Sequence, residues 1–129
     1  MTPRPSHKEL SSKLQQASKL AAQGSISILE PVIIVTDAIE LGYSFQLEFD
    51  SIFQELISKA KPENYAGGRP PQRSYETRIK GAELYAFVVQ SEQLDGIDVY
   101  FKYALYNDVV VLVSLHQDKQ GGNNGKLTE

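Results

Sequence analysis

The sequence predicts a single α+β domain in which three N-terminal helices pack on one face of a four-stranded antiparallel sheet. Two observations lead to this fold class. Apolar residues recur at helical spacing up to residue 60, whereas polar and apolar residues alternate with the period of a strand after residue 74. Between these halves, residues 61–74 contain paired glycines and three prolines, which prevent regular structure.

The first helix is predicted over residues 7–23. Ser6 and Glu9 have the spacing of a capping box, in which each side chain binds a free backbone amide of the first turn. The apolar residues of this helix recur at helical spacing, namely Leu10, Leu14, Ala17 and Ala21. Gly24 then supplies a stop signal.

The next segment, residues 30–42, carries conflicting signals. The β-branched run from Val32 to Val35 favours a strand, whereas Pro31 in a first turn and Gly42 as a C-terminal cap favour a helix. We interpret the segment as a short helix, with residues 30–36 left open between helix and strand. A third helix over about 46–60 follows from the apolar spacing of Phe49, Ile52, Phe53, Leu56 and Ile57.

Four strands are expected after the loop, over residues 74–80, 83–90, 97–106 and 109–117. Turn signals separate them at Lys80-Gly81, Asp95-Gly96 and Asn107-Asp108. Consecutive strands joined by short turns form an antiparallel meander, with the helices on one face. Residues 6–118 are therefore predicted to be the domain, between a flexible N-terminus at 1–5 and a flexible polar tail at 119–129.

Composition restricts the class of protein. The chain has 129 residues, of which 41% are hydrophobic, enough for one core. It contains no cysteine, which excludes disulfides and thiolate sites. Because no apolar stretch is long enough to cross a bilayer, we expect a cytoplasmic protein without a membrane partner.

Charge is unevenly distributed along the chain. The net charge of −3 gives no general attraction to nucleic acid. Residues 59–80, however, carry six basic and two acidic side chains, a local net charge of +4. This segment therefore predicts a cationic surface, although solvated loop charge gives the same pattern.

The register of the last hairpin decides where His116 lies. A two-residue loop at Asn107-Asp108 would place His116 opposite Val99, among core residues. A three-residue loop would place it opposite Tyr100. We favour the three-residue loop, because burying a polar side chain without a partner costs about 1–3 kcal/mol.

In that register the even-numbered positions of the last strand face away from the helices. The outer face of the sheet then gathers four polar side chains, namely Tyr100, Lys102, Ser114 and His116. An exposed sheet face with no function carries the same residue types, so this pattern alone does not define a site.

Several stretches, in this order, resemble the MqsR-like branch of the RelE/ParE toxin superfamily, the mRNA-cleaving partners of bacterial toxin–antitoxin pairs. They are SHKELSSKLQQASKLAAQG, AIELGYSF, ENYAGG, ELYAFVV and GIDVYFKYALYNDVVVLVSLHQDK, which cover most of residues 6–119. The resemblance implies a RelE-like arrangement of the α+β domain, an RNA substrate and a partner antitoxin protein.

The resemblance also implies roles for individual residues. Tyr100 of VYFK falls where the family has a catalytic tyrosine, and His116 falls near the position of a catalytic lysine. Arg69 or Arg73 would substitute for the family's lysine after the third helix. The family's glutamine on the preceding strand has no counterpart, because the chain has Ala82 and Glu83 there.

The implied reaction is metal-independent RNA cleavage with the 2′-hydroxyl as nucleophile. Histidine can act as general base or acid near neutral pH, and arginine can bind phosphate through two hydrogen bonds. The predicted catalytic residues are His116, Tyr100 and Arg73. The predicted substrate-binding residues are Arg69, Arg78, Lys102, Ser114 and Tyr65, with no metal and no cofactor; the sequence predicts no oligomeric state.

A second hypothesis is a non-catalytic protein-interaction module that keeps the RelE-like architecture. It would bind a partner by strand pairing or through tyrosines on the sheet. Metal or haem binding is a weaker alternative, because His7 and His116 lack companions at ligand spacing. AGGRPP also lacks the strand and helix that a phosphate-binding loop requires.

Overall fold

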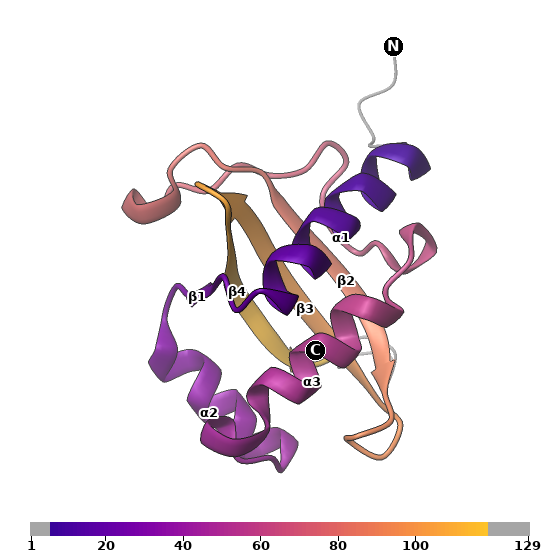
Figure 1. Ribbon diagram of the computed structural model, residues 1–129, viewed down its shortest axis with the longest axis vertical. Helices are drawn as coiled ribbons and strands as arrows, with labels where there is room; N and C mark the ends of the chain where they lie inside the picture. The colour runs from indigo at the N-terminus through magenta and orange to yellow at the C-terminus, as the bar shows by residue number, and fades with distance from the viewer. Residues whose placement is uncertain (1–5, 119–129) are drawn as a thin grey trace, which may run out of the picture.

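The computed structural model describes residues 6–118, so the two segments predicted to be flexible, 1–5 and 119–129, lie outside the described residues. Helices and a twisted sheet form an α+β domain (Figure 1). The elements are α1 (His7–Ala22), β1 (Ile26–Ile28), α2 (Pro31–Leu41), α3 (Phe45–Lys59), β2 (Leu84–Ser91), β3 (Ile97–Tyr106) and β4 (Val109–Gln117), with 3-10 turns η1 (Pro62–Asn64) and η2 (Thr77–Ile79).

The three predicted helices are confirmed. Ser6 caps α1 by accepting a hydrogen bond from the Glu9 amide at 3.0 Å. Residues 30–36 contribute to a helix rather than a strand, because Pro31 lies in the first turn of α2 and Gly42 ends it with a φ of 87°. Glycine adopts this left-handed conformation without a steric cost. The helix-start signal of Pro31 and the helix-end signal of Gly42 therefore outweigh the strand preference of the β-branched run.

The prediction of an antiparallel sheet is wrong. The strand order is β1-β4-β3-β2, and β1 runs parallel to β4, with Ile26 opposite Val110. Only β2, β3 and β4 form the expected antiparallel arrangement. The short β1 was missed because three residues are too few to show an alternating pattern.

Residues 74–80, predicted as a strand, instead form a turn around η2. An isolated bridge between Arg73 and Glu83 is the only ladder contact that the structure shows for residues 73–80. Ile79 is buried, whereas Tyr75 is 93% exposed. Because one apolar side chain is buried between solvated neighbours, the sequence of this segment alternates between polar and apolar residues as a strand does. The alternation therefore predicted a strand where the chain forms a turn.

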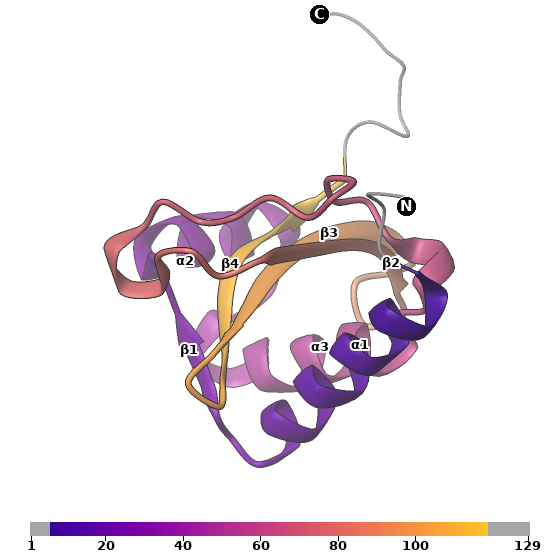
Figure 2. The same cartoon turned by 90° about the horizontal axis from the view of Figure 1, so that it is seen from above.

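Helices α1 and α3 cover one face of the sheet, whereas α2 packs beside β4 (Figure 2). Figure 2 shows α1 and α3 beneath one face, while the segment between η1 and β2 crosses the opposite, outer face. The buried side of α2 joins the main core beside β4. On the outer face, Ile79 packs with Ala104 and Val111 in a second, smaller apolar cluster.

Aromatic rings fill the main core between the sheet and the helices. The ring centroids of Phe53 and Phe101 lie 6.1 Å apart in an edge-on contact, and Phe87 lies 5.9 Å from Phe101. These side chains are fully buried. Among residues 6–118, no helix combines the length and the hydropathy that crossing a membrane requires.

The β3–β4 turn has two residues, so the predicted three-residue loop is wrong. Tyr106 pairs with Val109, and Asn107 and Asp108 have φ values of 53° and 59°. These positive angles match the tight hairpin turn that follows the twist of the strands. As a result, Val110 faces the helices, contrary to the prediction for even-numbered positions.

A β-bulge restores the predicted pairing farther along the hairpin. Leu112 pairs with Tyr103 and Ser114 with Lys102, which leaves Val113 as the extra residue. The bulge shifts the register by one residue. Odd-numbered side chains of β4 therefore face the helices after the bulge, whereas even-numbered ones face them before it. The hairpin thereby combines a two-residue turn, which suits the twist of the strands, with polar side chains on the outer face near the end of β4.

The Glu55 carboxylate on α3 holds the turn that joins β2 to β3. It accepts hydrogen bonds from the Ser91 hydroxyl at 2.8 Å and the Glu92 amide at 2.6 Å, and it pairs with Lys59 at 3.4 Å. Burial alone raises the pKa of Glu55, but the hydrogen bonds outweigh burial, so the net pKa is lowered.

We expect Asp108→Gly to raise the free energy of unfolding by up to about 1 kcal/mol, because glycine adopts a positive φ without steric cost. Asp108→Ala keeps the turn in the same backbone conformation and should lower the free energy of unfolding. Urea denaturation of both variants measures the difference. Equal midpoints for the two variants would contradict the turn geometry.

Glu55→Gln should lower the free energy of unfolding by about 1–3 kcal/mol at neutral pH, because a partly buried hydrogen-bond network loses its charged acceptor. Since the folded-state pKa of Glu55 is lowered, its contribution is present above the unfolded-state pKa and is lost as pH falls through the folded-state value. Urea denaturation at neutral and acid pH should show a smaller pH dependence for Glu55→Gln. Asp50→Asn, an exposed change on the same helix, should retain the dependence of the natural protein.

Candidate functional site

The tyrosine and histidine predicted to share the outer face lie side by side. Tyr100 pairs with His116 across β3 and β4, and their rings stack with centroids 5.0 Å apart and an interplanar angle of 17°. Phe101 and Leu115, the next pair along the ladder, are fully buried on the opposite side. Alternation along the strands therefore directs the Tyr100–His116 pair away from the main core.

Lys102 and Ser114 form the neighbouring pair on the same face. Both side chains are partly exposed. Same-face residues two positions apart on paired strands lie within reach of one another. The structure thus brings together the four polar side chains that the sequence placed on the outer face.

The His116 ring has a defined proton arrangement. Its Nδ1 lies 2.9 Å from the backbone carbonyl oxygen of Gln117. Because a carbonyl oxygen only accepts hydrogen bonds, this contact assigns the proton to Nδ1 in the neutral ring. Nε2 then carries the lone pair and can accept a proton from another molecule.

The Tyr100 phenol keeps its proton at neutral pH. Burial raises its pKa above the ordinary tyrosine value, and the negative charge of Asp118 raises it further. Tyr100 therefore presents a hydroxyl that donates a hydrogen bond, rather than a phenolate.

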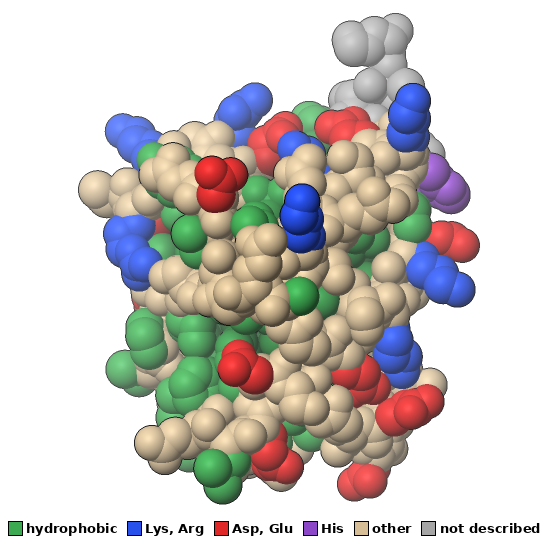
Figure 3. Space-filling view, in the orientation of Figure 1, with side chains coloured by type: hydrophobic (Ala, Val, Ile, Leu, Met, Phe, Trp, Pro, Cys, Tyr) green, Lys and Arg blue, Asp and Glu red, His purple; other side chains and the backbone are tan. Residues whose placement is uncertain are grey.

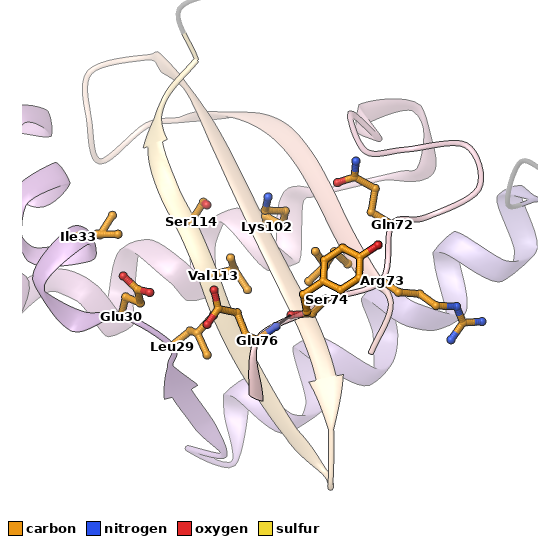
Figure 4. Close-up of a pocket in the computed structure, with 12 residues that line it drawn as sticks. Leu29, Glu30, Ile33, Gln72, Arg73, Ser74, Glu76, Lys102, Val113 and Ser114 are labelled. Carbon is orange, nitrogen blue, oxygen red and sulfur yellow. Dashed lines mark hydrogen bonds between the residues drawn. The ribbon is translucent and has the colours of Figure 1, made fainter. Parts of the chain in front are cut away.

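Two hollows adjoin on the outer face. The larger, of about 620 Å³, lies between the start of α2 and residues 72–76, with Lys102 and Ser114 projecting from β3 and β4 (Figure 4). The smaller, of about 220 Å³, is lined by Tyr100 and the loop glycines Gly67 and Gly68. The Lys102 residue lines both hollows, so it borders the Tyr100 side as well as the α2 side.

The larger hollow has mixed charge. Glu30 and Glu76 line it, and in Figure 4 both lie on the side away from Gln72. Glu30, Gln72 and Glu76 are not among the site residues predicted from the sequence. No local pattern marks them, because the loop reaches the sheet through hydrogen bonds such as Leu84 N–H to the Gln72 carbonyl, at 2.8 Å.

Two of the predicted arginines, Arg73 and Arg78, donate hydrogen bonds to backbone carbonyls of the protein itself. Arg73 Nη1 donates to the Gly81 carbonyl at 3.0 Å, and the Arg73 side chain points away from Lys102 in Figure 4. Arg78 donates to the carbonyls of Ile28 and Leu29 at 3.3 and 3.1 Å. Arg78 therefore joins segments 50 residues apart, whereas Arg73 joins residues eight positions apart in the same loop.

Arg69 and Tyr65 form a separate contact in the same loop. The Arg69 guanidinium carbon lies 5.1 Å from the centroid of the Tyr65 ring. The Tyr65 hydroxyl donates to the Gly68 carbonyl, and its ring meets Phe87 edge-on at 5.6 Å. Tyr65 is buried, so the ring supports the glycine loop beside the smaller hollow rather than offering a free stacking surface.

The described residues, 6–118, contain no cluster of three or more histidine, aspartate or glutamate side chains that could hold a metal ion. The chain also matches no family model, no curated protein and no solved structure. A function for this protein is therefore inferred from the geometry of the outer face.

Proposed function

We propose that this protein is a metal-independent endoribonuclease of a toxin–antitoxin-type system, which cleaves mRNA on the outer face of its sheet. The observation that carries the proposal is the stacked Tyr100–His116 pair next to Lys102. Tyr100 and Lys102 line the smaller hollow and supply a hydrogen-bond donor and a cation, and His116, stacked on Tyr100, supplies a proton acceptor. RNA cleavage by an internal nucleophile requires these functions and no bound metal.

In the proposed reaction, Nε2 of His116 takes the proton of a ribose 2′-hydroxyl. The 2′-oxygen forms a bond to the adjacent phosphorus, the bond from phosphorus to the 5′-oxygen breaks, and the leaving oxygen takes a proton from water. The products are a 2′,3′-cyclic phosphate and a 5′-hydroxyl end. Tyr100 donates a hydrogen bond to a phosphate oxygen, and the Lys102 ammonium balances the developing negative charge.

The larger hollow fits an unpaired base next to that phosphate. The Glu30 and Glu76 carboxylates accept hydrogen bonds, which the amino groups of bases donate. Sequence-selective RNA recognition depends on such contacts to splayed-out bases. In this arrangement the phosphate lies towards Lys102 and Tyr100, away from the two carboxylates.

The second candidate function is a non-catalytic protein-interaction module. The observation that favours it is that Arg73 and Arg78 donate hydrogen bonds to backbone carbonyls. Arg73 and Lys102 line the larger hollow, and Lys102 also lines the smaller one. Glu30 and Glu76 also repel phosphate. A protein segment would then occupy the outer face instead of RNA.

The endoribonuclease proposal predicts cleavage of single-stranded RNA in the presence of EDTA. His116→Ala should lower the cleavage rate by about 10²–10⁴-fold, because the proton acceptor is removed. Tyr100→Phe removes only the hydroxyl and should have a smaller effect. Gel analysis of labelled RNA measures both rates.

His7→Ala is the matched control, since His7 lies at the start of α1 on the other side of the sheet. This variant should cleave RNA at the natural rate. A preparation that shows no cleavage, or cleavage that neither His116→Ala nor Tyr100→Phe alters, would refute the proposal.

Lys102→Met should weaken RNA binding and reduce the slope of log affinity against log salt concentration by about 0.7, the value for one phosphate contact on a single strand. Lys19→Met, an exposed change on α1, should leave that slope unchanged. Fluorescence anisotropy with labelled RNA measures both slopes. Absence of RNA binding by the natural protein at low salt would favour the interaction module.

A further inference from the structure

The smaller hollow on the outer face differs in charge from the rest of the surface. The chain has a net charge of −3. Acidic side chains are spread over the helical side of the molecule in Figure 3, and Glu30 and Glu76 line the larger hollow. The residues that line the smaller hollow include Lys102 but no aspartate or glutamate. Its lining is therefore cationic, although the protein as a whole is acidic.

Three side chains of this lining have hydrogen-bond donors that no other group of the protein uses. They belong to Gln72, Tyr100 and Lys102. Within residues 6–118 the structure shows no hydrogen bond or ion pair for these three side chains. The Tyr100 hydroxyl keeps its proton, because burial raises its pKa. A ligand rich in acceptor atoms would satisfy all three.

The loop glycines Gly67 and Gly68 form another wall of the hollow. A Cβ atom on Gly67 would lie 2.7 Å from the Tyr65 hydroxyl oxygen, and one on Gly68 would lie 2.8 Å from the Pro70 carbonyl oxygen. The loop can therefore pack this closely only with glycine at both positions. In the part of the chain that the structure describes, the amides of Gly67 and Gly68 donate no hydrogen bond. Successive backbone amides without an internal partner are donors that anions accept.

The volume of the smaller hollow suits one chemical group rather than a whole small molecule. It is about 220 Å³, below the range of about 300–1,000 Å³ that is typical of ligand pockets. A phosphate monoester has three free oxygens and close to two negative charges at neutral pH, so it can accept hydrogen bonds from several walls at once. Gln72, Leu84 and Lys102 also line the larger hollow, which leaves room for the molecule that carries the phosphate.

We propose that the smaller hollow is a binding site for the terminal phosphate of a phosphate monoester. Lys102 supplies the positive charge, and the uncharged donors orient the phosphate oxygens. These donors are the Tyr100 hydroxyl, the Gln72 side-chain amide and the backbone amides of Gly67 and Gly68. Inorganic phosphate has the same chemistry and fits the same site. An internal phosphodiester of RNA has one negative charge and two free oxygens, so it uses fewer of the donors.

Phosphate binding does not depend on RNA cleavage, because His116 is not among the residues that line the hollow. If the protein cleaves RNA as proposed above, a bound phosphate monoester lies where Tyr100 and Lys102 would hold the RNA phosphate. It should then inhibit cleavage in competition with RNA. This regulation rests on the proposed function, whereas the binding site does not.

Nuclear magnetic resonance of the nitrogen-15-labelled full-length protein measures binding at the individual amides. Titration with inorganic phosphate, at an ionic strength held constant with chloride, should shift the amide signals of Gly67, Gly68 and the Gln72 side chain until they saturate. Uridine 3′-phosphate should shift the same signals, and uridine should not. Lys102→Met should raise the Kd for phosphate by at least about tenfold, because a charge-assisted hydrogen bond is lost. Gln72→Ala should raise it by about threefold or more, because a neutral donor is lost.

Lys80→Met is the matched control, since it removes an exposed cation of the same basic segment that lines neither hollow. It should leave the Kd for phosphate unchanged, and urea midpoints verify that each variant is folded. Shifts that do not saturate, shifts that chloride reproduces, or equal effects of Lys80→Met and Lys102→Met would overturn the proposal. Binding of uridine 3′-phosphate without binding of inorganic phosphate would also overturn it, because the base would then be the group recognised.

The same measurements separate this proposal from the endoribonuclease proposal. RNA cleavage by a protein that does not bind phosphate would remove the phosphate site and leave the endoribonuclease proposal standing. Saturable phosphate binding by a protein that does not cleave RNA would support the phosphate site and refute the endoribonuclease proposal.

Discussion

The pairing of β3 with β4 is the constraint on which the rest of this structure depends. A two-residue turn suits the twist of a hairpin, but without the bulge it would direct His116 into the core beside Val99. The extra residue Val113 resolves this conflict by shifting the register once, after Leu112. Apolar side chains on both sides of the bulge then face the helices, while Tyr100 and His116 meet on the outer face.

The outer face becomes a site because other segments build walls around it. The loop after α3 attaches to β2 through backbone hydrogen bonds, for example from the Ala66 amide to the Ala86 carbonyl at 2.8 Å. Arg78 fixes the following turn to the end of β1. The start of α2 supplies the opposite wall. Two arginines that the sequence suggests for phosphate binding thus donate hydrogen bonds within the fold, although Arg73 also lines the larger hollow, and Lys102 lines both hollows.

The acidic character of the chain is compatible with both proposals because charge is distributed by region. Lys102 and the protonated Tyr100 serve the outer face, where a phosphate would lie. The outward side of α2 carries an exposed apolar stripe, and the start of α2 lines the larger hollow.

Local signals along the chain are enough to predict the three helices and one arrangement of side chains. Caps such as Ser6, the stop at Gly42 and the helical spacing of α3 are local signals, so the three helices were predictable. Polar residues at matching positions were sufficient to place Tyr100, Lys102, Ser114 and His116 together. Only the tertiary structure decided the parallel pairing of β1, the turn around η2, the bulge and the hollows. These features depend on contacts between residues far apart in the chain, which no local periodicity records.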